Sequence, residues 1–457
     1  MRADRRSPHL RTTRRAVVGA LVAGGFTAAV PTAAPAFGLS GSQRRGTGSR
    51  DGGHPRPVQL TLPRPAGPYA VGTVELHLVD ERRADPWDAT RRRELMVSVW
   101  YAADGTHAAD AGSTGPGWRP RAPYMRPGAA ELFGQGAAEV LGLPPGTIDW
   151  AGARTHARTG AHVSRRAGRT PVVLFSPGMY NARTLGTSMA GQLASEGYAV
   201  VTIDHPGEAP VEFADGRVVG PSPELQQMTD QSARWQRALD IRAADIRFVL
   251  DQLRLLTDGG NPDAGRRRLP RGLAGALDLR KVGIYGHSMG GAAAAMAMHQ
   301  DRRIGAGVFL DSPMGLHWTD PDELLPVAKA GLDRPFLLMG AKLFHEDGSV
   351  EPHTHRTSAS LQSLWEHSPG WKRDLSFWPA AAHNSFTDYQ WLVPQLDQAF
   401  TLPEGLRAGM IGTVDPRRSM AAQRVYLTAF LDSTLRGLPR PVLDGPSPQH
   451  PDVRFIS

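Results

Sequence analysis

The pentapeptide G-H-S-M-G at residues 286–290 constrains the fold of this chain more than any other segment. A short apolar run, 282–285, precedes it, and a stretch of small residues, 292–297, follows it. A serine held on a sharp turn between a strand and a helix needs very small residues two positions before and after it, because the backbone there is strained. The pattern therefore predicts a strand, a tight turn and a helix, with the hydroxyl of Ser288 lifted clear of the sheet. A glycine-rich turn without a catalytic role is the alternative, and the flanking strand and helix patterns disfavour it.

The chain beyond residue 171 alternates apolar runs with helical patterns. Continuous apolar runs are typical of strands buried on both faces, and an alternating strand and helix order implies a mostly parallel sheet with helices on both faces. Period-two alternation at 71–79 and 95–101 predicts two further, antiparallel strands. We therefore expect one α/β domain over residues 65–457, with insertions near 102–168 and 257–277. The predicted strands are 171–176, 198–203, 282–285, 307–310, 336–339 and 375–378, and the predicted helices are 187–196, 224–256 and 419–436.

The N-terminal region is basic and then apolar. Arg14 and Arg15 precede an apolar stretch, which an A-x-A sequence ending at Ala36 follows. These features predict a twin-arginine export signal over residues 1–36, cleaved after Ala36, so that the mature chain is secreted. An uncleaved anchor is the alternative, but about 15 apolar residues are short for a membrane span. Residues 37–64 are rich in Gly, Ser, Arg and Pro and predict a flexible linker.

Charge and cysteine content limit the classes of partner. The formal net charge is +8, and the first 36 residues contribute +5 of it through six Arg and one Asp. The remaining arginines are dispersed among acids, so no nucleic-acid partner is expected. The chain has no cysteine, so an exported form must be held by its core rather than by disulfides.

A nucleophilic serine needs a histidine that accepts its proton and an acid that orients the imidazole. In hydrolases that place the serine on a sharp turn between a strand and a helix, the acid and then the histidine follow the serine along the chain. His383 lies just beyond the predicted strand 375–378, and loops at the carboxyl ends of strands carry the chemistry in open α/β sheets. His383 is therefore the candidate base.

Two positions compete for the acid. Asp311 ends the strand 307–310, whereas Glu346 or Asp347 follows the strand 336–339. Position alone leaves the choice open. Asp204 precedes the serine and is expected to be structural.

The backbone should supply two donors for an oxyanion. One is the amide of Met289, at the start of the helix that follows the serine. The other should come from the loop after the strand 171–176, where the Met179 amide is the candidate; a Pro-Gly turn without a role is the alternative. His353 and His355 form an H-x-H pair, but no third ligand is evident, so we expect a polar loop and neither metal nor cofactor.

Motifs along much of the chain resemble those of the plasma-type platelet-activating factor acetylhydrolases, a secreted phospholipase family of α/β-hydrolases. The resemblance covers roughly residues 66–79 and 170–437, and its most specific piece is H-x-x-F-x-D-[FY] around the histidine. The matching segments are G-P-Y-A-V-G at 67–72, F-S-P-G at 175–178, R-T-L at 183–185, L-A-S-E-G-Y at 193–198, G-H-S-M-G-G-A at 286–292, L-D at 310–311 and H-N-S-F-T-D-Y at 383–389.

The resemblance implies an α/β-hydrolase fold with Ser288 as nucleophile, Asp311 as acid and His383 as base. It also implies the amides of Met179 and Met289 as the oxyanion hole. The implied activity is calcium-independent hydrolysis of short or oxidised acyl esters of phospholipids, with transient contact to a lipid surface. One departure is plain: Pro177 stands where the family has histidine.

Three alternative functions share some of these features. Bacterial cutinase-like polyester hydrolases share the serine pentapeptide, but place their acid where this chain has Phe344, and they rely on cysteines that it lacks. A general carboxylesterase or lipase would use the same residues. A secreted binding protein with a relict site would tend to have lost one member of the constellation, and none is missing here.

Overall fold

The structure is a computed structural model and describes residues 57–105, 119–318, 322–345 and 349–457. The predicted export signal, most of the predicted linker, and Glu346 and Asp347 lie outside these residues. None of the helices in the described part of the chain has both the length and the apolar character that a membrane span requires.

A central sheet organises the fold, and twelve strands of the described residues belong to it. Its middle is parallel: β7 (Ala199–Ile203), β6 (Thr170–Ser176), β10 (Leu277–His287), β11 (Ile304–Leu310), β12 (Phe336–Gly340) and β15 (Lys372–Ser376) lie side by side in that order. The alternating pattern predicted two antiparallel strands, and they are β2 (Ala70–Asp85) and β3 (Asp88–Ala103). The structure adds that β3 pairs with β7, which joins the two strands to the parallel part of the sheet. The sheet is completed by β1 (Val58–Thr61), β4 (Arg121–Pro123), β5 (Ile148–Thr159) and β16 (Arg454–Phe455).

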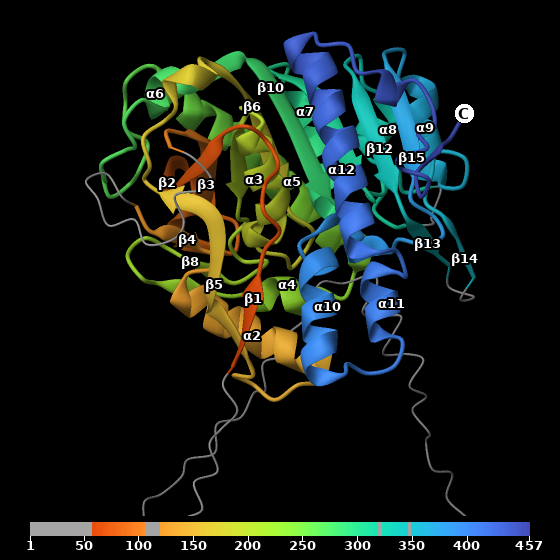
Figure 1. Ribbon diagram of the computed structural model, residues 1–457, viewed down its shortest axis with the longest axis horizontal. Coiled ribbons are helices and arrows are strands. Elements are labelled where there is room, and N and C mark those ends of the chain that lie inside the picture. The colour runs from red at the N-terminus through yellow and green to blue at the C-terminus, as the bar shows by residue number, and fades with distance from the viewer. Residues whose placement is uncertain (1–56, 106–118, 319–321, 346–348) are drawn as a thin grey trace, which may run out of the picture.

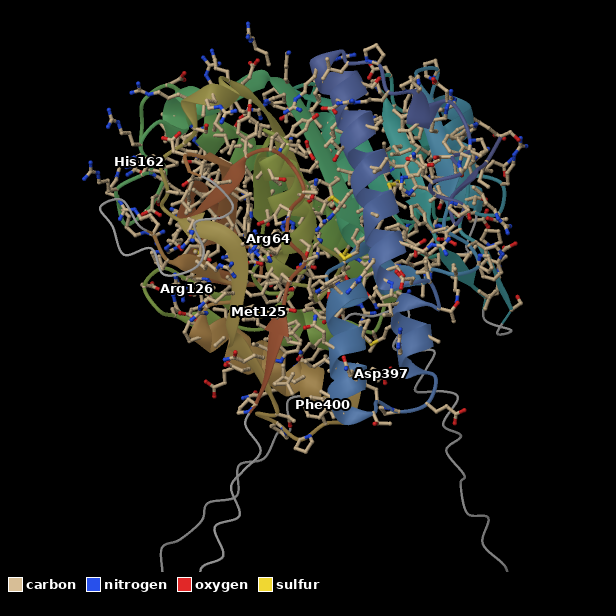
Figure 2. All side chains as sticks on the ribbon, in the orientation of Figure 1. Arg64, Met125, Arg126, His162, Asp397 and Phe400 are labelled. Carbon is tan, nitrogen blue, oxygen red and sulfur yellow. The ribbon has the colours of Figure 1, made fainter. Side chains whose placement is uncertain are left out.

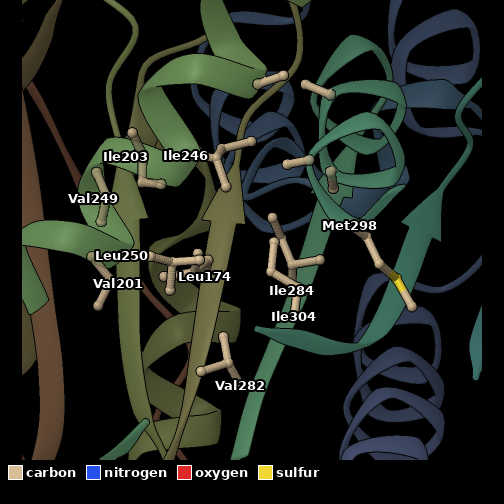
Figure 3. Packing of buried hydrophobic residues seen from close by; sticks show 14 of the residues in the cluster. Leu174, Val201, Ile203, Ile246, Val249, Leu250, Val282, Ile284, Met298 and Ile304 are labelled. Carbon is tan, nitrogen blue, oxygen red and sulfur yellow. The ribbon is translucent and has the colours of Figure 1, made fainter. Parts of the chain in front are cut away.

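Helices cover both faces of this sheet (Figure 1), and the strand residues alternate between them. On one face Leu174 and Ile284 pack under α5 (Gln231–Thr257) and α7 (Met289–Gln300), as Figure 3 shows. On the other face the next residues in the same strands, Phe175 and Tyr285, pack under α3 (Thr187–Ser195) and α12 (Pro416–Leu431). Burial on both faces explains the continuous apolar runs. The α/β-hydrolase fold is therefore confirmed.

A smaller apolar cluster lies at one end of the molecule, where α2 (Pro127–Leu141) meets α10 (Tyr389–Phe400) and α11 (Leu406–Ile411) (Figure 1). In Figure 2, Phe400 lies on the side of α10 that faces α2, and Asp397, which pairs with Arg407, lies on the side toward α11. The insertion near 102–168 thus contributes α2 and β5 to this end of the molecule.

Two predictions of boundaries need correction. Val58–Thr61 is strand β1, which pairs in parallel with β5, so the end of the predicted linker 37–64 is part of the sheet. The predicted helix 224–256 is two helices, α4 (Pro223–Gln227) and α5. The helix is interrupted before Asp230, which is the N-cap of α5. The side chain of Asp230 accepts a hydrogen bond from the amide of Ala233 in the first turn of this new helix.

The remaining elements are short or lie at the edges. They are β8 (Val211–Glu212) with β9 (Val218–Val219), β13 (Lys342–Phe344) with β14 (Val350–Pro352), the helices α6 (Leu273–Ala276), α8 (Pro326–Ala330) and α9 (Ala359–His367), and the short helical turns η1 (Arg165–Ala167), η2 (Arg183–Gly186), η3 (His383–Phe386), η4 (Asp432–Arg436) and η5 (Pro441–Leu443).

The aspartate of the H-x-x-F-x-D motif ties two helices together. Asp388 immediately precedes α10, but its carboxylate accepts the amide of Ser188 in the first turn of α3, at 3.1 Å. Its own amide donates to the carbonyl of Leu185 at 2.8 Å. Burial raises the pKa of Asp388 to about 7, although the hydrogen bond from Ser188 and the charge of Arg424 act in the opposite direction.

This raised pKa predicts a pH-dependent stability. The folded state keeps the proton of Asp388 up to about pH 7, whereas the unfolded state loses it near the ordinary value of 3.8, so stability falls as the pH rises through that window. Asp388→Asn removes this loss. Between about pH 5 and about pH 8, the free energy of unfolding of the variant should gain about 2–3 kcal/mol relative to the wild type, at about 1.4 kcal/mol per pKa unit. Urea unfolding at both pH values measures it, and a difference that is constant or moves the other way would contradict it.

Candidate active site

The turn at Ser288 has the strain that the pentapeptide predicted. Strand β10 ends at His287, α7 begins at Met289, and Ser288 between them has φ 55° and ψ −130°. A Cβ on Gly286 would lie 2.2 Å from the carbonyl oxygen of Gly290, and one on Gly290 would lie 2.1 Å from that of Ser176. Neither position has room for a side chain, so both glycines are required by close backbone approach.

Asp311 and His383 meet beside this turn. Asp311 directly follows β11, and His383 begins η3, after β15. His383 Nδ1 lies 2.7 Å from Asp311 Oδ2. The amide of Ser288 donates to the carbonyl of Leu310 at 2.9 Å, which holds the serine turn against the end of β11. The three residues therefore follow β10, β11 and β15, and they meet where these parallel strands have their carboxyl ends.

The Ser288 hydroxyl makes no hydrogen bond within the described residues. Such a bond often forms or shortens only when substrate is present. His287 contacts the candidate base, His383. The Nε2 atom of His287 lies 2.9 Å from the backbone carbonyl oxygen of His383, and the centroids of the two rings are 4.4 Å apart. Burial, with a contribution from His383, lowers the pKa of His287 to about 3, so this imidazole is neutral and donates through Nε2.

A second histidine binds Asp311, and the sequence did not reveal it. His353 Nδ1 lies 3.0 Å from Asp311 Oδ1, which also accepts the amide of Ala341 at 2.8 Å. Burial alone would raise the pKa of Asp311, but the hydrogen bonds from His353 and His383 outweigh it and hold the pKa well below its usual range. The carboxylate is therefore ionised at neutral pH. The H-x-H pattern was the only signal, and it carries no information about which carboxylate each imidazole meets.

The other member of the pair, His355, points elsewhere. Its Nδ1 lies 2.7 Å from Asp374 Oδ2, and its ring stacks on Trp365 at 3.9 Å. The two imidazoles therefore bind different carboxylates rather than a common ion. Within the described ranges, no three histidine, aspartate, glutamate or cysteine side chains cluster as a metal site would require.

Two backbone amides border the serine. Gly178, in the loop after β6, lies so close that a Cβ on it would be 3.4 Å from Ser288 Cβ. The next amide, that of Met179, finds no acceptor in the part of the chain that the structure describes. Met289 is the first residue of α7, where an amide lacks an intrahelical acceptor. Donors in these places can bind a negative oxygen that forms at a carbonyl attacked by Ser288.

Trp318 completes the surroundings, and the sequence gave no reason to select it. Its ring lies edge-on to His383 at 5.2 Å and 5.1 Å from His353. It covers both imidazoles that contact Asp311. The described residues also place Asp204 away from this group: its carboxylate pairs with Arg183 and accepts the Arg183 amide at 2.7 Å, which is the structural role expected for it.

Comparisons with known proteins show what this chain is similar to. A "Probable 1-alkyl-2-acetylglycerophosphocholine esterase" of Arthroderma benhamiae is 27% identical over 419 residues, which are 88% of this chain and 95% of that protein. The platelet-activating factor acetylhydrolase of Bos taurus is 24% identical over 283 residues, which are 56% of each chain. The solved structure of a ferulic acid esterase from Streptomyces cinnamoneus aligns with a TM-score of 0.66 and 34% identity, covering 88% of this chain and all of that one.

The names of these three relatives are all names of carboxylic ester hydrolases, and this chain is a carboxylic ester hydrolase as well. The resemblance noted in the motifs extends over most of the sequence, because a family profile matches residues 57–436. The chain therefore belongs to the family described as platelet-activating factor acetylhydrolase, isoform II.

Proposed function

We propose that the chain hydrolyses short or oxidised acyl esters of phospholipids through an acyl-enzyme on Ser288. The observation that carries the proposal is the 2.7 Å contact between His383 Nδ1 and Asp311 Oδ2 beside the strained serine. Asp311 fixes the proton on Nδ1, so Nε2 of His383 is free to accept the proton of Ser288. The family and the name of the Arthroderma benhamiae relative support the substrate class.

The reaction runs in two halves. Ser288 attacks the ester carbonyl as His383 takes its proton, and the amides of Met179 and Met289 bind the negative oxygen. His383 then gives the proton to the leaving alcohol, and the acyl group remains on Ser288. A water molecule, deprotonated by the same imidazole, then attacks the acyl carbon, the bond to Ser288 Oγ breaks, the acid leaves, and His383 returns the proton to Ser288. The residues named need no metal ion or cofactor for any of these steps.

Esters of hydroxycinnamic acids are a second candidate class. The observation that favours them is the 34% identity with the ferulic acid esterase, which exceeds the 27% identity with the phospholipid esterase relative. Pro177, where the acetylhydrolase motif has histidine, directly precedes Gly178, whose added Cβ would lie 3.4 Å from Ser288 Cβ. Polyester hydrolysis is the third class to test, because cutinase-like enzymes share the serine pentapeptide.

The substrate proposal predicts an order of kcat/KM. A phospholipid with an acetyl ester should exceed methyl ferulate and a polyester film, in the presence of EDTA. Activity should fall gradually from acetyl to hexanoyl, since one methylene is worth only about 1–3 kcal/mol in a pocket. Presenting the same lipid as monomers and in vesicles tests the proposed contact with a lipid surface, which predicts faster hydrolysis in vesicles.

The control for that series is Ser288→Ala, which should lower kcat by about 10⁴-fold on every active ester. A preference for methyl ferulate would move the chain to the second class. Loss of activity in EDTA, or an optimum at long unoxidised acyl chains, would contradict the proposal itself.

If Asp311 orients His383, as proposed, then Asp311 and its second partner, His353, should both affect kcat. Asp311→Asn should lower kcat by about 10⁴-fold, because the imidazole of His383 then adopts the wrong tautomer. Asp347→Asn should stay within a few-fold of the wild type. His353→Phe should lower kcat by about tenfold to a hundredfold, since a hydrogen bond to a charged group is worth about 1.5–3 kcal/mol.

The matched control for His353→Phe is His355→Phe, which removes an equally buried imidazole from a different carboxylate. It should lower the free energy of unfolding and leave kcat of the folded protein within a few-fold of the wild type. Equal losses of kcat in the two variants would show that His353 has no special link to catalysis.

We also propose that the chain is exported by the twin-arginine route and cleaved after Ala36. The support is the order of Arg14 and Arg15, a short apolar segment and the A-x-A site. Replacing both arginines by lysine should leave precursor in the cell, and N-terminal sequencing of secreted protein should begin at Phe37. Secretion that the double change does not affect would favour the general export route.

A further inference from the structure

A buried ion pair lies directly behind the loop that follows β6. Arg242 of α5 and Glu208 are each 1% exposed. The pair is bidentate: Arg242 Nε lies 2.9 Å from Glu208 Oε1, and Nη2 lies 2.6 Å from Oε2. Burying two charges is costly unless further hydrogen bonds use the remaining donors. The partners of those remaining donors therefore indicate what the pair is for.

The remaining donors of Arg242 bind two successive backbone carbonyls. Nη1 donates to the carbonyl of Pro177 at 2.5 Å, and Nη2 donates to that of Gly178 at 3.1 Å. The planar guanidinium has fixed donor directions, so it fixes the direction of both carbonyls, which the single flexible ammonium of lysine would not do.

The carbonyl of Gly178 and the amide of Met179 belong to one peptide unit. A peptide unit is planar and trans, so its C=O and N–H point in opposite directions. Holding the Gly178 oxygen toward Arg242 therefore turns the Met179 N–H away from α5. It also polarises the peptide, which strengthens the N–H as a donor. Gly178 is the residue whose added Cβ would lie 3.4 Å from Ser288 Cβ, so this peptide unit begins beside the serine.

The start of the same loop is held by a second buried network. Ser176 Oγ lies 3.0 Å from His205 Nε2, and His205 Nδ1 lies 3.0 Å from Asp245 Oδ2, which pairs with Arg93. This array has the chain of contacts of a catalytic triad. However, Ser176 is 0% exposed and His205 is 2% exposed, so no substrate reaches it. It fixes the residue from which the loop departs.

We propose that Arg242 is a positioning residue for catalysis: paired with Glu208, it holds the Pro177 and Gly178 carbonyls so that the Met179 amide points at the oxyanion. The proposal rests on the function proposed above. Arg242 does not touch substrate and acts through the peptide unit between Gly178 and Met179. Its removal should therefore weaken binding of the transition state more than binding of the ester.

The test compares Arg242→Met with the double variant Arg242→Met, Glu208→Gln, which leaves no buried carboxylate without a partner. Both should lower kcat by about 10²–10³-fold, the scale of losing one oxyanion donor, with KM within about threefold of the wild type. The inhibition constant of an alkyl boronic acid, which forms a tetrahedral adduct on serine, should rise by the same factor as kcat/KM falls. If neither variant folds, Arg242→Lys, which keeps the charge but not the fork, should show the same pattern.

The chain offers a matched control in Arg436→Met. Arg436 likewise binds two successive carbonyls, those of Glu196 and Gly197 at 3.0 and 2.7 Å, and a buried carboxylate, Asp432 at 2.9 Å. Those carbonyls precede β7, at the edge of the sheet opposite Ser288. This variant should lose stability but keep kcat and boronic acid affinity within a few-fold.

Unchanged kcat in the Arg242 variants, or a loss confined to KM, would overturn the inference. If Arg436→Met lost kcat equally, the role of Arg242 would be structural. Activity that persists in Ser288→Ala would instead overturn the proposed function, so the two failures are distinguishable.

Discussion

The carboxylate of Asp311 is the point on which the rest of the site depends. It accepts hydrogen bonds from His383, His353 and the amide of Ala341, which come from three separate segments that reach one edge of the sheet. A carboxylate buried to this extent would ordinarily be protonated, and these donors keep it charged. The same bonds set the orientation of His383. The geometry of the proposed triad is thus a consequence of satisfying one buried charge.

The buried polar groups next to this site also have hydrogen-bond partners. Loops that leave parallel strands have carbonyls without partners in the sheet, and buried carbonyls need donors. In this protein the donors are arginines paired with acids: Arg242 with Glu208 under the loop after β6, and Arg93 with Asp245 beside it. The chain has no cysteine, and its site is held by these buried ion pairs in addition to the apolar core.

The features that could be predicted from the sequence are those that depend on residues close together along the chain. The elbow, the buried strands and the antiparallel pair β2 and β3 depend on residues that are neighbours along the chain, so their pattern is visible there. The choice of Asp311 as the partner of His383 depended on the family resemblance, because position in the sequence alone also allowed Glu346 or Asp347. The contacts of His353 and Arg242 could not be predicted, since they join residues far apart in sequence whose partners are fixed only by packing. The break before α5 was missed because the apolar spacing continues across it, whereas the cap at Asp230 interrupts the backbone.

In the proposed mechanism Ser288 carries the acyl group during turnover. Rapid mixing of the enzyme with an acetyl ester, quenching in acid and peptide mass spectrometry measures this directly. We expect an acetyl adduct on the peptide that contains Ser288, formed at least as fast as turnover and absent from Ser288→Ala. An adduct on another residue, or steady turnover with no adduct on Ser288 under conditions where deacylation is slow, would contradict it.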